Sequence, residues 1–151
     1  MFYDILWTFL ISLSPFGEAR VGIPYGVAQE LPIILVFIIG LSGNLLVFPI
    51  FYKAIEIANK YLWKNKTYKK GALYLALRAR TKTQNVIKKY GVWGLMVFVM
   101  IPLPVTGAYI GTIAAFIFRI NYQRSFIAVS IGITLSSIMV TILWPLLVSI
   151  F

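Results

Sequence analysis

Glu18 and Arg20 are the residues of this chain with the clearest potential for chemistry, because they are the only acid and base within an apolar stretch, residues 5–29. A charge in apolar surroundings must find a counter-charge, water or a bound partner. Residues two apart do not face each other on a helix, so direct pairing requires a non-helical turn. Glu18 is therefore a candidate proton or cation site and Arg20 a candidate anion site. The alternative is a structural pair that locks the local fold.

Two further polar groups interrupt apolar segments. Thr106 stands in the sequence Pro102-Leu-Pro104-Val-Thr106-Gly107, which supplies unbonded backbone groups and one hydroxyl. We expect this segment to face Glu18 and Arg20 in a shared polar site, while Thr106 can also cap a following helix. Asn44 follows Ser42 and Gly43 in an otherwise apolar run. Small residues there favour close helix packing, with substrate contact as the alternative role for Asn44.

The composition argues against catalysis. Histidine and cysteine are absent, which excludes thiolate and imidazole metal sites and every nucleophile pair that uses a histidine base. The four carboxylates, Asp4, Glu18, Glu30 and Glu56, are too few and too scattered to favour a hydrolytic metal centre. We therefore predict that the protein is not an enzyme and that it uses no cofactor and no metal.

Apolar residues make up 60% of the 151-residue chain and charged residues only 12%. Three segments, residues 31–52, 90–118 and 125–151, contain no Asp, Glu, Lys or Arg. Because about 20 apolar residues cross a bilayer as a helix, each segment is long enough to span it. The sequence predicts an all-α integral membrane protein.

The distribution of charge predicts the orientation. Eleven of the fourteen basic residues lie between Lys53 and Lys89, within a net charge of +10. The positive-inside rule places residues 53–89 in the cytoplasm, and we prefer it to nucleic-acid binding. Within this segment, residues 69–89 predict a helix that lies on the anionic inner leaflet or in the cytosol. Both termini are then expected outside a multi-pass plasma or inner membrane.

Residues 5–29 and 90–118 each contain a break. Proline and glycine interrupt both segments and divide each into two helical arms of about 10 to 12 residues, or roughly 15–18 Å. Such arms reach about half-way across a ~30 Å hydrocarbon core. The residues at the predicted breaks are Pro15, Gly17, Pro24, Pro102, Pro104 and Gly107.

The charges at residues 119 and 124 favour one topology over another. If both broken segments are re-entrant hairpins, Arg119 and Arg124 become cytoplasmic and the positive-inside rule holds throughout. If all four apolar segments span, both arginines lie outside. We therefore predict two re-entrant helical hairpins, each followed by one transmembrane helix, with a four-helix bundle as the alternative.

The two halves also align with each other. At a constant separation of 89 residues, the Pro-x-x-x-Ala-x-x-Gly pattern from Pro15 to Gly22 repeats from Pro104 to Gly111. Leu6 and Phe9 align with Leu95 and Phe98 at the same separation. An odd number of crossings between two such copies makes the repeat inverted, as in many transporters. We predict a single domain made of residues 1–52 (first repeat), 53–89 (basic linker) and 90–151 (second repeat).

The segments Ser14-Pro-Phe-Gly-Glu-Ala-Arg-Val-Gly-Ile-Pro24 and Pro102-Leu-Pro-Val-Thr-Gly-Ala-Tyr-Ile-Gly111 resemble the small multidrug export protein family, a distant relative of DedA proteins and VTT-domain lipid scramblases. The resemblance covers nearly the whole chain. It implies opposed re-entrant hairpins, a role in transport or lipid translocation, and equivalence of Glu18 and Arg20 with the embedded acid and arginine of that superfamily. DedA-type proteins carry further charges in the second hairpin, where this chain has none.

Together these features predict a small membrane transporter or lipid flippase with a polar site between two hairpin tips. The alternative is a non-transporting protein whose basic loop organises anionic lipid or recruits a partner. We expect membrane lipids as partners, a small anionic or lipid substrate, no nucleic acid, and a homodimer or higher oligomer, because so short a chain has little surface to seal a cavity.

Overall fold

The computed structural model describes residues 1–101 and 107–150, and within these ranges the protein is built from helices and contains no strand. The helices are α1 (Phe2–Leu13), α2 (Glu18–Ala28), α3 (Ile33–Leu62), α4 (Lys66–Tyr90), α5 (Val92–Met100), α6 (Ala108–Ile117) and α7 (Tyr122–Ile150). Two of them, α3 and α7, are long and apolar enough to cross a membrane. At ~1.5 Å per residue, the 30 residues of α3 measure roughly 45 Å.

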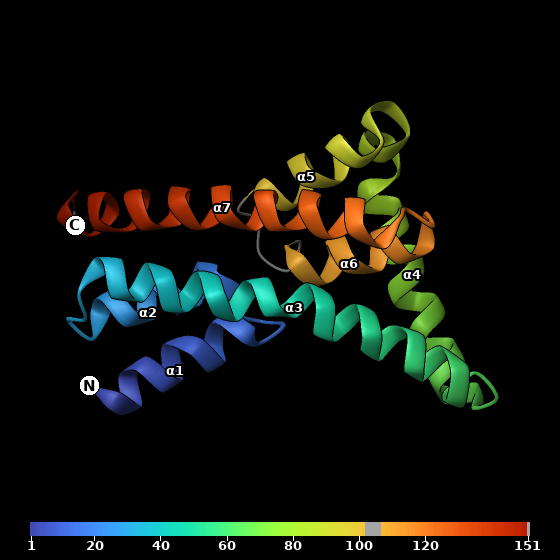
Figure 1. Ribbon diagram of the computed structural model, residues 1–151, viewed down its shortest axis with the longest axis horizontal. Coiled ribbons are helices and arrows are strands. Elements are labelled where there is room, and N and C mark those ends of the chain that lie inside the picture. The colour runs from blue at the N-terminus through green and yellow to red at the C-terminus, as the bar shows by residue number, and fades with distance from the viewer. Residues whose placement is uncertain (102–106, 151) are drawn as a thin grey trace.

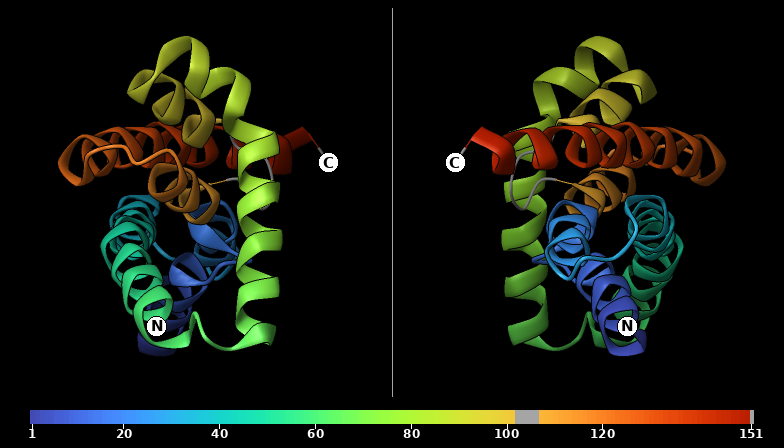
Figure 2. Two further views of the ribbon diagram at one scale, coloured as in Figure 1. Left: turned by 90° about the vertical axis from the view of Figure 1, so that its right-hand side faces the viewer. Right: turned by 90° about the vertical axis from the view of Figure 1, so that its left-hand side faces the viewer.

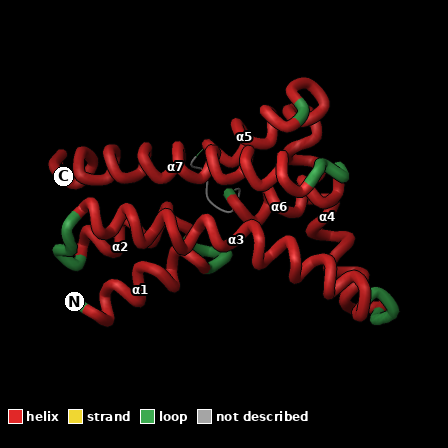
Figure 3. Tube along the Cα trace, viewed as in Figure 1, coloured by secondary structure: helices red, strands yellow, loops and turns green. Residues whose placement is uncertain are grey.

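Short helices pair with one another at opposite ends of the molecule. Helices α1 and α2 form a hairpin whose turn lies near the centre, and α5 and α6 approach the centre from the opposite end (Figure 1). The long helices α3 and α7 run in opposite directions beside them. In Figure 3 the loops α2–α3 and α6–α7 mark these two opposite ends. The turn after α1 and the first residue of α6 therefore share the middle of the protein.

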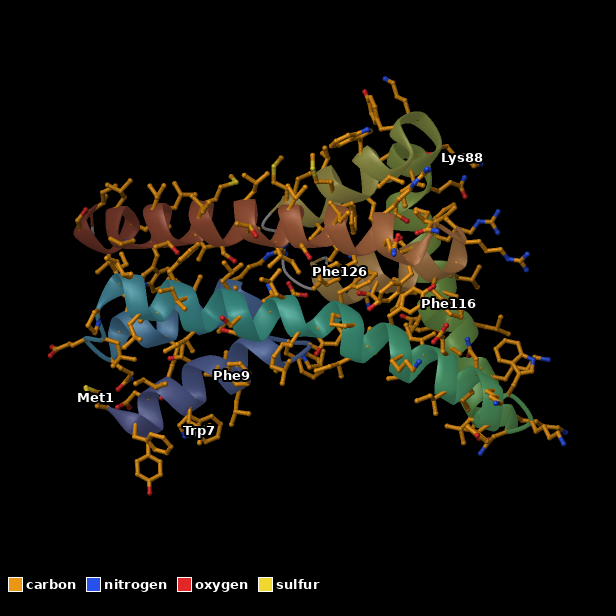
Figure 4. The ribbon with its side chains drawn as sticks, viewed as in Figure 1. Met1, Trp7, Phe9, Lys88, Phe116 and Phe126 are labelled. Atoms are coloured by element: carbon orange, nitrogen blue, oxygen red, sulfur yellow. The ribbon has the colours of Figure 1, made fainter. Side chains whose placement is uncertain are left out.

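Helix α4 lies across one end of the molecule, roughly perpendicular to the long helices (Figure 2). Basic side chains gather at this end, around Lys88, whereas Met1 lies at the other end (Figure 4). Arg119 lies in the α6–α7 connection and Arg124 in the first turn of α7, and this connection also lies at the α4 end. Glu30, in the α2–α3 connection, lies at the opposite end. Most of the positive charge thus lies at one pole.

The predicted breaks agree only in part with the structure. Pro15 and Gly17 lie in the turn between α1 and α2, and Gly107 directly precedes α6, as predicted. The prediction for Pro24 is wrong, because Pro24 lies inside α2. Its ring removes one backbone donor, and this eleven-residue helix tolerates the loss. Pro102 and Pro104 lie outside the described residues.

The basic segment is helical over more residues than predicted. The helix expected over residues 69–89 is confirmed as α4, Lys66–Tyr90. Asn65 caps it, because its Oδ1 accepts a hydrogen bond from the Thr67 backbone N–H at 2.9 Å. Helix α3 continues to Leu62, ten residues past the boundary drawn at residue 52. The division into repeats and linker stays a prediction.

In the first half, glycines allow helices to pack closely against α1. A Cβ atom on Gly43 of α3 would lie 2.9 Å from the carbonyl oxygen of Phe9 and 3.2 Å from Ser12 Cβ. A Cβ atom on Gly22 of α2 would collide with Ser12 Oγ. Ser12 is itself fully buried. Both helices therefore approach α1 to a distance that only glycine permits.

The second half repeats this arrangement around α5. A Cβ atom on Gly132 of α7 would lie 2.7 Å from the carbonyl oxygen of Met96, and one on Gly111 of α6 would lie 2.6 Å from Val99 Cγ2. Gly111 and Gly132 each follow their counterparts in the first half by 89 residues. The residues that these glycines contact lie on α1 and α5, and there the separation is different. Phe9 and Met96 are 87 residues apart, not the 89 that the sequence alignment predicts.

Helices α2 and α6 end in the same unusual backbone geometry. Glu30 follows α2 with φ 60°, and its successor Leu31 donates a hydrogen bond to the Gly26 carbonyl at 3.2 Å. Arg119 follows α6 with φ 52°, and Ile120 donates to the Ala115 carbonyl at 3.0 Å. Both are Schellman caps, which usually place glycine at the left-handed position. Here opposite charges occupy that position at opposite ends of the molecule.

This geometry predicts that Glu30→Gly stabilises the protein. A left-handed backbone costs a non-glycine residue about 1 kcal/mol, a cost that glycine does not incur. We expect thermal unfolding of the purified protein in detergent to occur a few degrees higher, roughly the shift that 1 kcal/mol produces in a chain of this size. Glu30→Ala is the matched control, because it removes the charge and keeps the strain. Equal melting temperatures for the two variants would contradict the strain argument.

Candidate functional site

The turn between α1 and α2 presents Glu18 at the centre of the molecule. Ser14 forms this turn, since its hydroxyl donates to the Ile11 carbonyl at 2.9 Å and accepts from the Gly17 amide at 3.0 Å. Glu18 follows with φ 51°, a left-handed conformation uncommon for a residue with a side chain. The whole residue is only 5% exposed. The turn therefore holds a strained, buried acid where the two hairpins meet.

The Glu18 carboxylate lies against the first residues of α6. The backbone amides of Ala108 and Tyr109 lie beside it and favour its negative charge. A Cβ atom on Gly107 would lie 2.6 Å from the Glu18 carboxyl carbon, so the carboxylate occupies the space of a side chain there. The first amides of a helix have no partner within it, and they carry the positive end of the helix dipole. Glu18 thus caps a helix of the other hairpin.

Arg20 makes the complementary contacts. Its Nη2 donates to the carbonyl oxygen of Val99, in the last turn of α5, at 2.9 Å. Its Nε donates to Ser136 Oγ on α7 at 3.3 Å and lies 3.9 Å from Glu18 Oε2. The last carbonyls of a helix carry the negative end of its dipole, which a guanidinium stabilises. One acid–base pair of the first hairpin therefore neutralises both helix ends at the break of the second hairpin.

Tyr109 makes the equivalent contact from the second hairpin to the first. Its hydroxyl donates to the carbonyl of Leu13, the last residue of α1, at 2.5 Å. Arg20 and Tyr109 are 89 residues apart, the same separation as the glycine pairs. Each hairpin thus places one donor from its second arm on the last turn of the other hairpin's first arm.

Glu18 has no acidic counterpart in the second half of the chain. The residue 89 positions after Glu18 is Gly107, and the Glu18 carboxylate fills the space beside that glycine. A second acid at residue 107 would place two carboxylates together, where repulsion and the loss of hydration are both costly. The two hairpins therefore share one central acid.

The remaining predicted site residues have different outcomes. Asn44 lies on the buried stripe of α3, 3% exposed, and its Oδ1 has no hydrogen-bond partner among the described residues. The neighbouring Gly43 packs against α1, so the prediction of close helix packing is confirmed there. Thr106 lies outside the described residues, and its role stays a prediction. Within the described part of the chain, Asp, Glu, His and Cys form no group of three able to hold a metal.

Sequence reasoning missed three partners of the charged pair. Val99 contributes only a backbone carbonyl, which every residue has, so no sequence signal identifies it. Ser136 is one of several serines on α7, and nothing in its own sequence context distinguishes it. Tyr109 could have been found, because it follows Arg20 by the repeat separation of 89.

Comparison with protein families identifies the chain. Residues 18–139 match the model of the family described as "Putative small multi-drug export protein". The match begins at Glu18 and extends into α7, so it includes Arg20, Tyr109 and Ser136. The chain belongs to this family. With the two long apolar helices, membership makes it a helical membrane protein of the small multidrug export type. Comparisons with curated proteins and with solved structures gave no match.

Proposed function

We propose that this member of the small multidrug export family is a membrane transporter whose substrate passes the Glu18–Arg20 pair at the centre of the molecule. The observation that carries the proposal is the buried pair itself, with side chains 6% and 11% exposed. Ionisable side chains in the interior of a membrane protein are costly and generally functional. This pair also bridges four helices (α2, α5, α6 and α7), so displacing it would loosen the contact between the hairpins.

We infer that the two halves are inverted repeats and that both hairpins are re-entrant. The hairpins enter from opposite ends and meet in the middle, while α3 and α7 run in opposite directions (Figure 1). The glycines at the helix crossings, the left-handed residues of the Schellman caps and the Arg20 and Tyr109 donors recur at a separation of 89 residues. A re-entrant turn is tolerated at membrane depth where protein buries it, as it does around Glu18. A kinship with DedA and VTT-domain proteins stays a prediction.

The charge distribution supports an orientation in the plasma or inner membrane. Arg119, Arg124 and α4 share one pole, which the positive-inside rule assigns to the cytoplasm. Both termini lie at the other pole, which would face outward. Many apolar side chains on α1 and α7 are exposed, including Trp7 at 53% and Ile142 at 58%. Lipid or a second copy would cover them, and we propose a homodimer or higher oligomer.

Arg20 and Glu18 would act on a substrate in different ways. A guanidinium binds phosphate or carboxylate by paired hydrogen bonds, so a small anion or a lipid headgroup could replace Glu18 beside Arg20. The released Glu18 carboxylate would remain on the α6 amides or take up a proton. Asn44 and Thr106 are proposed as further polar contacts of the same path. The mechanism needs no enzyme chemistry, cofactor or metal.

The proposal predicts that Glu18→Gln and Arg20→Lys each reduce transport at least about tenfold, an effect near 1.4 kcal/mol. The measurement uses the full chain in liposomes with two probes. Flipping of fluorescent phosphatidylglycerol is followed by dithionite quenching, and movement of ethidium by its fluorescence on DNA. Glu30→Gln is the matched control, because it removes an acid at the opposite end of α2. Wild-type transport of both probes by folded Glu18 and Arg20 variants would contradict the site.

A second candidate function rests on α4. Its basic side chains favour a non-transporting protein that organises anionic lipid or recruits a partner at the cytoplasmic face. Neutralising Lys64, Lys66, Lys69 and Lys70 together distinguishes the two. Wild-type transport by this quadruple variant supports the transporter. Loss of function in the cell, with transport and the Glu18–Arg20 pair intact, supports the second function.

A further inference from the structure

A cavity lies away from the charged pair, at the basic pole. It has a volume of about 640 Å³ and is enclosed by the second half of α3, the first half of α4 and the end of α6. This volume is within the range of small-molecule sites. Its lining is mostly apolar, with side chains such as Phe51, Ile55, Leu75 and Ile113. Figure 2 shows how α4 stands apart from α3 at this end.

Positive charge borders this cavity. Arg119 lines it, and its backbone is fixed by the Schellman cap that ends α6. Lys69 Nζ lies 5.5 Å from the centre of the ring of Trp63, which lines the cavity. Eleven basic residues and a single acid, Glu56, occupy the segment 53–89 that forms most of its walls. An apolar interior with a cationic border is complementary to an anionic amphiphile.

Gly71 gives an independent reason to expect an occupant. It lies inside α4, where glycine weakens a helix relative to alanine. Elsewhere in the chain, a Cβ atom on a helical glycine would press against a neighbouring helix, as at Gly22 or Gly132. A Cβ atom on Gly71 would meet no described atom within 4 Å, and Gly71 lines the cavity. Protein packing therefore does not account for this glycine, which leaves the α4 backbone open to the cavity.

Two polar groups at the α3–α4 wall are already paired with each other. The Tyr68 hydroxyl donates to Asn59 Oδ1 at 3.0 Å, and both residues line the cavity. This bond ties α4 to α3 and keeps that wall in place. The cationic border then offers the most strongly charged contacts to a ligand, and the apolar walls offer the rest.

We propose that this cavity binds an anionic phospholipid of the inner leaflet, with an acyl chain between α3, α4 and α6 and the phosphate beside Arg119. The leaflet is the source because the cavity lies at the pole where the positive-inside rule places the anionic membrane surface. Charge complementarity and open apolar space select this ligand over a neutral lipid. The site is separate from the Glu18–Arg20 pair and does not depend on transport.

The test uses the purified full chain, delipidated in neutral detergent, with phosphatidylglycerol or phosphatidylcholine as the probe. Phosphatidylglycerol should raise the melting temperature and remain bound in native mass spectrometry, whereas phosphatidylcholine should do neither. Gly71→Leu places a side chain at a cavity-lining position whose Cβ meets no described atom within 4 Å, so it should fold as well as wild type and lose bound phosphatidylglycerol about tenfold. Arg119→Gln should abolish the preference for the anionic lipid.

Two matched controls place the site in the cavity. Thr81→Leu places the same leucine side chain at an exposed position of α4 that does not line the cavity, and Lys88→Gln removes a charge near the end of α4. Both should bind phosphatidylglycerol as wild type does. Unchanged lipid retention by folded Gly71→Leu would overturn the proposal, as would equal effects of the two lipids on wild type. Dimers of wild type that Gly71→Leu converts to monomers, without a change in lipid binding, would assign the cavity to a second copy.

Discussion

Arg20→Gln should lower the melting temperature of the protein by on the order of 10 °C, because breaking a buried ion pair from one side costs roughly 3–5 kcal/mol. The substitution leaves Glu18 buried beside α6 without its counter-charge. It also removes the donors to the Val99 carbonyl and to Ser136. Thermal unfolding of the purified protein in detergent, followed by circular dichroism, measures the loss.

A double-mutant cycle separates the pair from the individual side chains. Glu18→Gln in the Arg20→Gln background removes both charges, so the double variant should lose clearly less than the sum of the two single losses. Arg124→Gln is the control, because Arg124 lies exposed at the start of α7 and should change stability little. Additive losses in the cycle would show that Glu18 and Arg20 do not interact in the folded protein.

Gly43→Ala and Gly132→Ala should destabilise the protein by similar amounts, about 1–3 kcal/mol each, because both overpack a helix crossing. The added methyl group meets the Phe9 carbonyl in the first half and the Met96 carbonyl in the second. A backbone carbonyl within a helix cannot rotate away as a flexible side chain can. Chemical or thermal denaturation of the two variants under the same conditions compares the halves.

Gly71→Ala is the matched control for these substitutions. Its new methyl group meets no described atom within 4 Å, and alanine favours a helix by up to about 1 kcal/mol over glycine. This variant should therefore be as stable as wild type or more stable. A loss in Gly132→Ala but not in Gly43→Ala would show that the two halves are not packed equivalently, and the internal repeat would lose its main structural support.

Those parts of the fold that depend on local chemistry could be predicted from the sequence. Pro15 and Gly17 identify the first turn, because proline and glycine disfavour a continuous helix there. The basic, proline-free segment identifies α4. Pro24 misled the prediction, because the tolerance of a helix for an internal proline is set by its surroundings and not by the proline itself.

The candidate site was only partly predictable for a different reason. Glu18 and Arg20 are evident from the sequence, since charges are conspicuous in an apolar stretch. Their partners are the amides of α6 and the carbonyl of Val99, which are backbone groups present in every residue. Only the three-dimensional arrangement brings these groups to the charges. The position of the Glu18 carboxylate in the space beside Gly107 is likewise a property of the folded chain.

The long sequence separation between Arg20 and its partners has a consequence for how the protein is made. Val99 and Ser136 follow Arg20 by 79 and 116 residues. At about 5–20 residues per second, a ribosome needs roughly 4 to 23 seconds to add them. During this interval the nascent first hairpin carries the Glu18–Arg20 pair and lacks the second-half groups that contact it in the folded protein. The insertion machinery, or water at the membrane surface, must shelter that hairpin until the second half of the chain has been synthesised.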